Sequence, residues 1–239
     1  GPGFIDNIVT KKGEVVRVYL PPDANCLLSV ADHCFRSRNY LNLIVIDKQP
    51  QLQWLSMDEA REHCARGAGI WKWCGNDQNG EPDIVLACAG DIATQETVAA
   101  AWYLRKHLPD LKVRVVNVVD LMTLPPRDRH PHGMDQSDFV NLFTLDKHVI
   151  FAFHGYPGVI HQVVHGRPDT DRFHVRGYNA EGSTTTPFDM VVLNKMSRVH
   201  LCMDAIRYVP RLADRVPELT RLANEVLERH RRYVSEHFE

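Results

Sequence analysis

The chain has 239 residues, 44% of them hydrophobic and 24% charged, and a formal net charge of -2 at pH 7. This composition is typical of a globular protein and excludes a chain that is disordered throughout. The near-neutral charge provides no broad basic surface for nucleic acid or for an anionic membrane. No apolar run approaches the roughly 20 residues of a membrane-spanning helix, so we expect neither a nucleic-acid partner nor a membrane partner.

The six cysteines are scattered through the chain and form no C-x-x-C pair. Most of them have apolar neighbours, where a reduced thiol behaves as a small hydrophobic side chain rather than as a disulfide partner or a zinc ligand. This pattern indicates a cytoplasmic protein.

Residues 1–55 predict a single strand–helix–strand unit. Glu14–Leu20 is rich in β-branched residues, Leu41–Ile46 is almost entirely apolar, and Asp23 is placed to N-cap the helix between them. Such a unit favours parallel pairing, but two strands and one helix cannot cover both faces of a parallel sheet. We therefore expect the incomplete end of a larger sheet, preceded at Gly1–Pro2 by what remains of a cleaved affinity tag.

Residues 56–79 are expected to form a linker. Ser56–Glu59 has the spacing of a capping box, which predicts a short helix that ends near Arg66. The polar turn Gly75–Asp83 then marks the change to a different pattern.

Residues 80–239 predict a complete α/β domain, because strands and helices alternate regularly. We expect a mostly parallel sheet with flanking helices. The expected strands are 83–89, 112–119, 148–153 and 173–175, and the expected helices are 94–108, 136–142, 156–165, 199–208 and one from Pro217 onward. The pattern at 191–194 fits a helix or a strand.

Lys48 is the leading candidate for a ligand contact. It follows the predicted strand Leu41–Ile46, and ligands of parallel sheets collect beyond the carboxyl ends of the strands. A lysine there can bind an anion as a point charge. The pattern alone favours a solvated lysine, and Pro50 would stiffen the loop in either case.

His130 and His132, with Arg127, form a second candidate site on the loop Pro125–Met134. They could bind an anion or supply two metal ligands, but no third ligand stands nearby in the sequence. A solvated loop explains the same residues. His154 follows another predicted strand and is better placed for a ligand group, although capping or packing is the commoner role of such a residue.

Ser183 and Thr184 belong to the polar segment Glu181–Pro187. Their hydroxyls could bind an anion or make the hydrogen bonds of a turn or cap. The structural role is the favoured interpretation.

The sequence lacks the common short motifs of catalysis and cofactor binding, namely the phosphate loop, the dinucleotide-binding glycines, the nucleophile elbow and H-E-x-x-H. The regular alternation alone would allow an independent flavodoxin-like binding protein, but the incomplete N-terminal unit opposes it. We therefore expect no complete catalytic site within this chain.

Long segments in the same order along the chain resemble the phosphoketolases, which are thiamine-diphosphate enzymes of the transketolase superfamily. The segments are VRVYLPPDANCLL (16–28), RSRNYLNLIV (36–45), KQPQLQWL (48–55), GEPDIVLACAGD (80–91), LPDLKVRVVNVVDLMTL (108–124), DKHVIFAFHGYP (146–157) and HVRGYNAEGSTTTPFDMVVLN (174–194). The resemblance implies that 1–55 is the tail of a pyrimidine-binding domain. It also implies that 80–239 is a C-terminal domain with a transketolase-like sheet.

The resemblance further implies an aldehyde-lyase that uses thiamine diphosphate and Mg²⁺. Such an enzyme cleaves xylulose 5-phosphate, often also fructose 6-phosphate, with inorganic phosphate, and it yields acetyl phosphate, an aldose phosphate and water. The cofactor would lie between domains of different subunits, so a homodimer or larger assembly is expected. The family's active-site histidine and its cofactor ligands would lie upstream of Gly3–Phe4, so we expect this chain alone to bind no cofactor and to be inactive.

Lys48 matches the family lysine that contacts the substrate phosphate, and it is the one active-site residue that the resemblance transfers to this chain. Asp47 departs from the family pattern, where a small residue is expected. A carboxylate at this position could weaken phosphate binding or point away from the lysine. As an alternative function, the C-terminal domain could be a regulatory or dimer-assembly module that binds an anionic metabolite through the second candidate site or the hydroxyls near residue 183.

Overall fold

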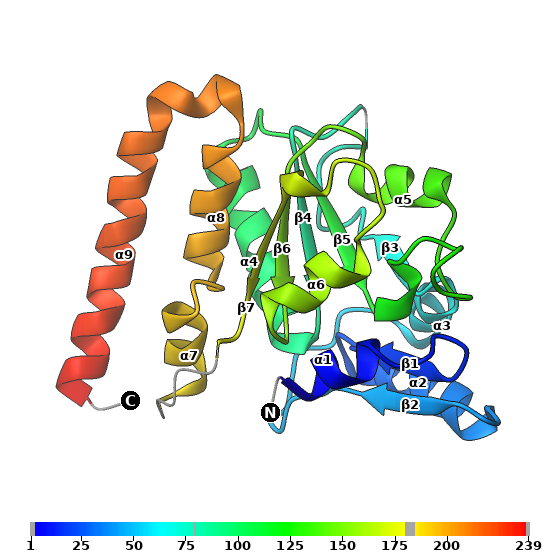
Figure 1. Ribbon diagram of the computed structural model, residues 1–239. Helices are drawn as coiled ribbons and strands as arrows, with labels where there is room; N and C mark the ends of the chain where they lie inside the picture. Colours follow the sequence, from blue (N-terminus) through cyan, green and yellow to red (C-terminus); the bar gives the residue numbers. More distant parts are fainter. Residues whose placement is uncertain (1–2, 79, 180–184, 238–239) are drawn as a thin grey trace.

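The structure is a computed structural model that describes residues 3–78, 80–179 and 185–237. It contains a two-stranded sheet near the N-terminus and a five-stranded sheet in the rest of the chain (Figure 1). The five-stranded sheet has the strand order β3-β5-β4-β6-β7. Its strands are β3 (Ala68–Ile70), β4 (Ile84–Ala89), β5 (Val113–Val118), β6 (Val149–Phe153) and β7 (Phe173–Gly177).

The small sheet pairs β1 (Val16–Tyr19) with β2 (Leu41–Ile44) in parallel, as the sequence predicts. The connecting helix α2 (Ala24–Arg36) begins at Asp23, whose Oδ1 accepts a hydrogen bond from the Cys26 backbone N–H at 2.8 Å. The N-cap prediction is therefore confirmed. Among the described residues, no strand pairs with the outer edge of β2.

The large sheet is mostly parallel, which confirms the predicted fold class. Strands β4, β5, β6 and β7 are parallel to one another, and the edge strand β3 pairs with β5 in the antiparallel direction. Strand β3 and helix α3 (Met57–Arg66), which begins with the predicted capping box at Ser56, both lie within the expected linker 56–79. This segment therefore contributes an edge strand to the sheet of the C-terminal unit.

Helices cover both faces of the large sheet. Alternate residues of each central strand point to opposite sides, and in β4 and β6 the residues on both sides are buried. In β4, Val85 and Ala87 face one side, and Ile84 and Leu86 face the other. The first face is covered by α1 (Gly3–Val9), α5 (Gln136–Phe143) and α6 (Pro157–Val163). The second face is covered mainly by α4 (Asp91–His107) and α8 (Arg198–Arg207).

The remaining helices extend the second layer outward. The segment 191–194, for which the sequence left helix and strand open, lies at the end of α7 (Pro187–Leu193) and at its C-cap. The last helix, α9 (Val216–His237), lies outside α8 (Figure 1). Within the described part of the chain, no helix is both long and apolar enough to cross a membrane.

The two sheets meet at the end of β1. The Leu20 backbone N–H donates to the Val119 carbonyl at 2.8 Å, and Tyr19 forms an antiparallel bridge with Asp120. Helix α1, which the sequence did not predict, adds apolar side chains to the core shared by both sheets. The N-terminal unit therefore packs directly against the C-terminal unit.

Candidate functional site

Lys48 lies on the exposed loop that follows β2, beyond the carboxyl end of that strand. None of the described carboxylates lies within ion-pair distance of its ammonium group. The neighbouring Asp47 carboxylate accepts hydrogen bonds from the Lys48 backbone N–H at 2.6 Å and from Gln51 Nε2 at 2.5 Å. Asp47 therefore organises the loop backbone instead of neutralising the lysine.

Asp91, the first residue of α4, connects this loop to the large sheet. Its Oδ2 accepts a hydrogen bond from the Asp47 backbone N–H at 2.5 Å. Its Oδ1 accepts from the Ile92 backbone N–H at 2.8 Å and from His154 Nδ1 at 3.0 Å. Burial raises the pKa of Asp91, but the hydrogen bond and charge of His154 and the backbone donors outweigh burial, so the pKa lies below its usual value.

The strand ends approach one another closely at this edge. Gly90 has a φ of +105°, and a Cβ added there would lie 2.4 Å from the Cβ of His154, so only glycine fits between β4 and β6. Tyr178, which follows β7, packs its ring edge-on against His154. Burial, aided by the carboxylates of Asp91 and Asp47, raises the pKa of Tyr178 to about 12. We call Asp47, Asp91, His154 and Tyr178 the carboxyl-edge cluster.

Sequence reasoning found only part of the carboxyl-edge cluster. It placed His154 at a strand end, and the structure shows that this histidine contacts Asp91. It missed Asp91 and Tyr178, although each stands directly after a glycine, Gly90 after β4 and Gly177 at the end of β7. A glycine followed by a polar residue at the carboxyl end of a strand was the sequence signal that could have identified both residues.

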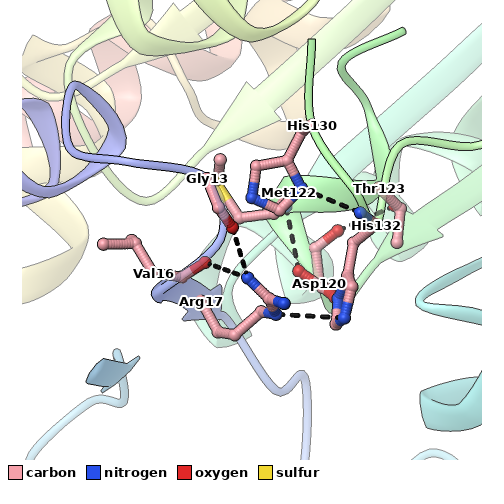
Figure 2. Close-up of polar contacts among 8 residues, drawn as sticks. All are labelled: Gly13, Val16, Arg17, Asp120, Met122, Thr123, His130 and His132. Carbon is pink, nitrogen blue, oxygen red and sulfur yellow. Dashed lines mark hydrogen bonds and ion pairs between the residues drawn. The ribbon is translucent and has the colours of Figure 1, made fainter. Parts of the chain in front are cut away.

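His130 and His132 do lie together, at the junction between the two sheets (Figure 2). Buried Arg17 of β1 donates from Nε to His132 Nε2 at 3.0 Å. Because Nε2 accepts this bond, the proton of His132 resides on Nδ1, which lies 3.3 Å from Asp120 Oδ2. The side chains of Arg17, His132 and Asp120 therefore form a hydrogen-bonded chain.

The other hydrogen bonds around Arg17, His132 and Asp120 involve backbone groups. Arg17 donates from one terminal nitrogen to the carbonyls of Gly13 and Val16, each at 2.7 Å, and Asp120 accepts from the Met122 backbone N–H at 2.9 Å (Figure 2). His130 Nδ1 accepts from the His132 backbone N–H at 3.1 Å, and burial, with the charge of Arg17, lowers the pKa of His130. These contacts hold the backbone on each side of the junction, and the hydrogen bond from Arg17 to His132 joins β1 to the C-terminal unit.

Metal binding finds no support at this junction, because the described residues contain no group of three or more histidine, cysteine or acidic side chains placed to hold a metal ion. Arg127 is exposed and pairs with Asp135 at 3.3 Å. It lines an open pocket of about 460 Å³ together with Lys12, Glu14, Arg129 and His130.

The hydroxyl candidates Ser183 and Thr184 lie outside the described residues. Their described neighbours make structural hydrogen bonds. Thr185 Oγ1 donates to Asp189 at 2.6 Å, and Thr186 caps helix α7 by accepting from the Asp189 backbone N–H at 3.3 Å.

Solved structures similar to this chain are transketolases, which at this level of sequence identity shows the fold alone. A transketolase from Leishmania mexicana matches with a TM-score of 0.64 and 13% identity, over 88% of this chain and 27% of that one. A split-gene transketolase, described as an inactive beta4 tetramer, matches with a TM-score of 0.60 and 16% identity, over 82% of this chain and 58% of that one.

Sequence comparisons agree on one family. The family model described as XFP C-terminal domain matches residues 48–239, and the model described as D-xylulose 5-phosphate/D-fructose 6-phosphate phosphoketolase matches residues 1–37. A probable phosphoketolase 2 from Nostoc sp. is 59% identical over 100% of this chain, and a probable phosphoketolase from Rhodopseudomonas palustris is 60% identical over 99%. The chain spans 30% of the length of each of these relatives. It belongs to the phosphoketolase family.

Proposed function

We propose that this chain forms the C-terminal part of a thiamine-diphosphate-dependent phosphoketolase. The full-length enzyme cleaves xylulose 5-phosphate, and often also fructose 6-phosphate, with inorganic phosphate to give acetyl phosphate, an aldose phosphate and water. The family assignment supports the reaction. The placement of Lys48 supports this chain's own contribution, because its ammonium is exposed beyond a strand end on a loop that hydrogen bonds hold in place.

Lys48 is proposed to bind the phosphate group of the sugar substrate. An ammonium group attracts a phosphate dianion and donates up to three hydrogen bonds to it. The Asp47 carboxylate accepts two hydrogen bonds from its own loop, so the departure from the family pattern at this position is compatible with phosphate binding.

The described residues of this chain do not fit the Mg²⁺ and diphosphate of the cofactor, because they contain no cluster of three or more potential metal ligands. We propose that the rest of the full-length enzyme holds the cofactor, which supplies the electron sink for carbon–carbon bond cleavage. The role of this chain is to bind and orient the substrate and to support the assembly.

The test is steady-state kinetics of a full-length phosphoketolase that contains this sequence. Lys48→Ala should raise the KM for the sugar phosphate about 10- to 100-fold, the effect of losing one charge-assisted hydrogen bond. Lys72→Ala, at an exposed lysine in the turn after β3, is the matched control and should leave KM unchanged. Equal KM values for the Lys48 variant and the parent enzyme would refute the proposed contact.

The chain alone provides a second test. Incubated with thiamine diphosphate, Mg²⁺, xylulose 5-phosphate and phosphate, it should form no acetyl phosphate. Formation of acetyl phosphate by the chain alone would contradict the assignment of the cofactor site to the rest of the enzyme.

We also propose that the enzyme is cytoplasmic and works as a homodimer or larger assembly. The free thiols of all six cysteines are compatible with a reducing compartment. Light scattering of the full-length enzyme measures the assembly, and a monomeric mass at full activity would contradict it.

A second candidate function is anion sensing at the pocket beside His130. Its lining comes from both units of the fold, and the cationic side chains of Lys12, Arg127 and Arg129 outnumber the carboxylates of Glu14 and Asp128. An anionic metabolite bound there would bridge the two units and could change activity or assembly. Thermal-shift series with nucleotides and carboxylates test this function in the chain and in the full-length enzyme, with Arg129→Ala as the pocket variant. Unchanged melting temperatures in both proteins would refute it.

A further inference from the structure

We infer that Asp91 is a positioning residue for Lys48, through which the C-terminal unit sets the place of the phosphate-binding lysine. This inference rests on the proposed role of Lys48. Asp91 lies 43 positions from Lys48 in the sequence, on helix α4, which packs against the large sheet, and not on the lysine's own loop.

The contact that carries the inference is the hydrogen bond from the Asp47 backbone N–H to Asp91 Oδ2, at 2.5 Å. The Asp47 carboxylate then accepts from the Lys48 backbone N–H at 2.6 Å. Asp91 therefore fixes the peptide nitrogen one residue before the lysine, and Asp47 fixes the next one. Two consecutive backbone groups of the loop are held.

Asp91 is itself held firmly. Its side chain is buried, and Oδ1 is engaged by the Ile92 backbone N–H and by His154 Nδ1. Its place as the first residue of α4 also favours a negative charge, because the positive end of the helix dipole lies there. With Oδ1 occupied by these donors, Oδ2 points to the loop.

A fixed loop matters for phosphate binding because ordering a mobile lysine on binding costs entropy. A lysine that is already placed loses less freedom when the phosphate arrives, and small displacements of a binding group weaken the productive geometry. Loss of the Asp91 carboxylate should therefore act on substrate binding through Lys48, although Asp91 does not itself touch the substrate.

The experiment is a double-mutant cycle in the full-length enzyme, with KM for xylulose 5-phosphate as the readout. Asp91→Ala should raise KM roughly 5- to 10-fold with a smaller change in kcat. Asp91→Asn keeps one acceptor oxygen for Asp47 and should give an intermediate KM. In the Lys48→Ala background, Asp91→Ala should raise KM less than twofold, because the group that it positions is already absent.

Asp77→Ala is the matched control. Asp77 is a buried carboxylate of similar exposure that pairs with Arg114 at 2.7 Å, near the amino end of β5 and thus at the opposite edge of the sheet. It should lower the melting temperature without changing KM. The control separates positioning of the loop from loss of stability, and the Asp91→Asn variant serves if Asp91→Ala does not fold.

The outcomes are distinguishable. If Lys48→Ala leaves KM unchanged, the proposed function of Lys48 fails. If Lys48→Ala raises KM but the Asp91 variants leave KM at the parent value, the inference about Asp91 is overturned and the role of Lys48 stands. An equal rise in KM from Asp91→Ala in both backgrounds would likewise overturn the inference about Asp91 alone.

Discussion

Arg17 of β1 donates a hydrogen bond from Nε to His132 Nε2 at 3.0 Å, and this bond crosses the junction of the two sheets. His132 in turn lies 3.3 Å from the buried carboxylate of Asp120. The positive and negative charges at the two ends are therefore connected through one neutral imidazole. A buried charge is stable only while it keeps its partners, so the imidazole stabilises both ends.

Replacing His132 with alanine should lower the free energy of unfolding by about 1–3 kcal/mol, because the buried side chains of Arg17 and Asp120 each lose a hydrogen-bond partner. Arg127→Ala, in the same loop, removes an ion pair whose side chains are 67% and 54% exposed, and it should cost less than about 1 kcal/mol. Urea denaturation of the chain measures both values. Equal losses for the two variants would contradict the structural role of His132.

Stability should fall on acidification between about pH 6.5 and pH 4. Burial, with nearby His148, lowers the pKa of His174 to about 4, and burial lowers the pKa of His200 to about 4. The unfolded chain then binds protons at a higher pH than the folded chain, so the stability present above pH 6.5 is lost as the pH falls toward 4. Each histidine contributes less than the limiting slope of about 1.4 kcal/mol per pH unit, because both remain partly solvated.

The His174→Phe variant checks this pH dependence. A phenyl ring preserves the stacking on Tyr208, whose ring centroid lies 3.6 Å from that of His174, but it cannot take up a proton. Urea midpoints at pH 7.5 and pH 5 should differ less in this variant than in the parent chain. His237→Phe, near the exposed end of α9, is the control and should keep the parent difference. An unchanged difference in the His174 variant would count against the assignment.

The ion pair between Glu96 of α4 and Arg198 of α8 should be stabilising only while both partners are present. Glu96 is 1% exposed and accepts from the Arg198 backbone N–H at 2.6 Å and from its guanidinium at 3.0 and 2.7 Å. Arg198→Met leaves a buried carboxylate without its cation and should cost about 3–5 kcal/mol. Combining it with Glu96→Met should recover much of that loss.

Urea denaturation of Arg198→Met, of Glu96→Met and of the double variant measures the free energy of unfolding of each. Arg221→Ala is the control, because Arg221 pairs with Glu225 on the exposed surface of α9, and it should cost less than about 0.5 kcal/mol. A double variant as unstable as the sum of its single changes would show that the pair does not act as a unit.

Local sequence patterns predicted most elements of the fold but not the contacts between distant segments. Asp23 is an example, since its role as N-cap of α2 follows from the residues beside it. Its second oxygen accepts from the Trp54 and Leu55 backbone N–H groups at 3.0 and 2.9 Å. No local pattern predicts a bond to residues more than thirty positions away.

The short elements escaped prediction for a related reason. Strand β3 has the sequence Ala-Gly-Ile, which shows no alternation and low strand propensity, and its pairing with β5 supplies the stability. At the candidate sites, the spacing of His130 and His132 predicted their proximity. Arg17, the hydrogen-bond partner of His132, lies 115 positions away in the sequence, so the sequence could not reveal that this pair joins two sheets.

The position of β3 in the large sheet determines where a separately produced C-terminal domain should begin. A C-terminal domain produced from residue 80 onward would lack α3 and β3, and the outer edge of β5 would then present unpaired backbone groups from Val116 to Val118. Such an edge is a template for association between chains. A version meant to stand alone should begin at or before Ser56, where the capping box starts α3, so that the sheet retains its antiparallel border.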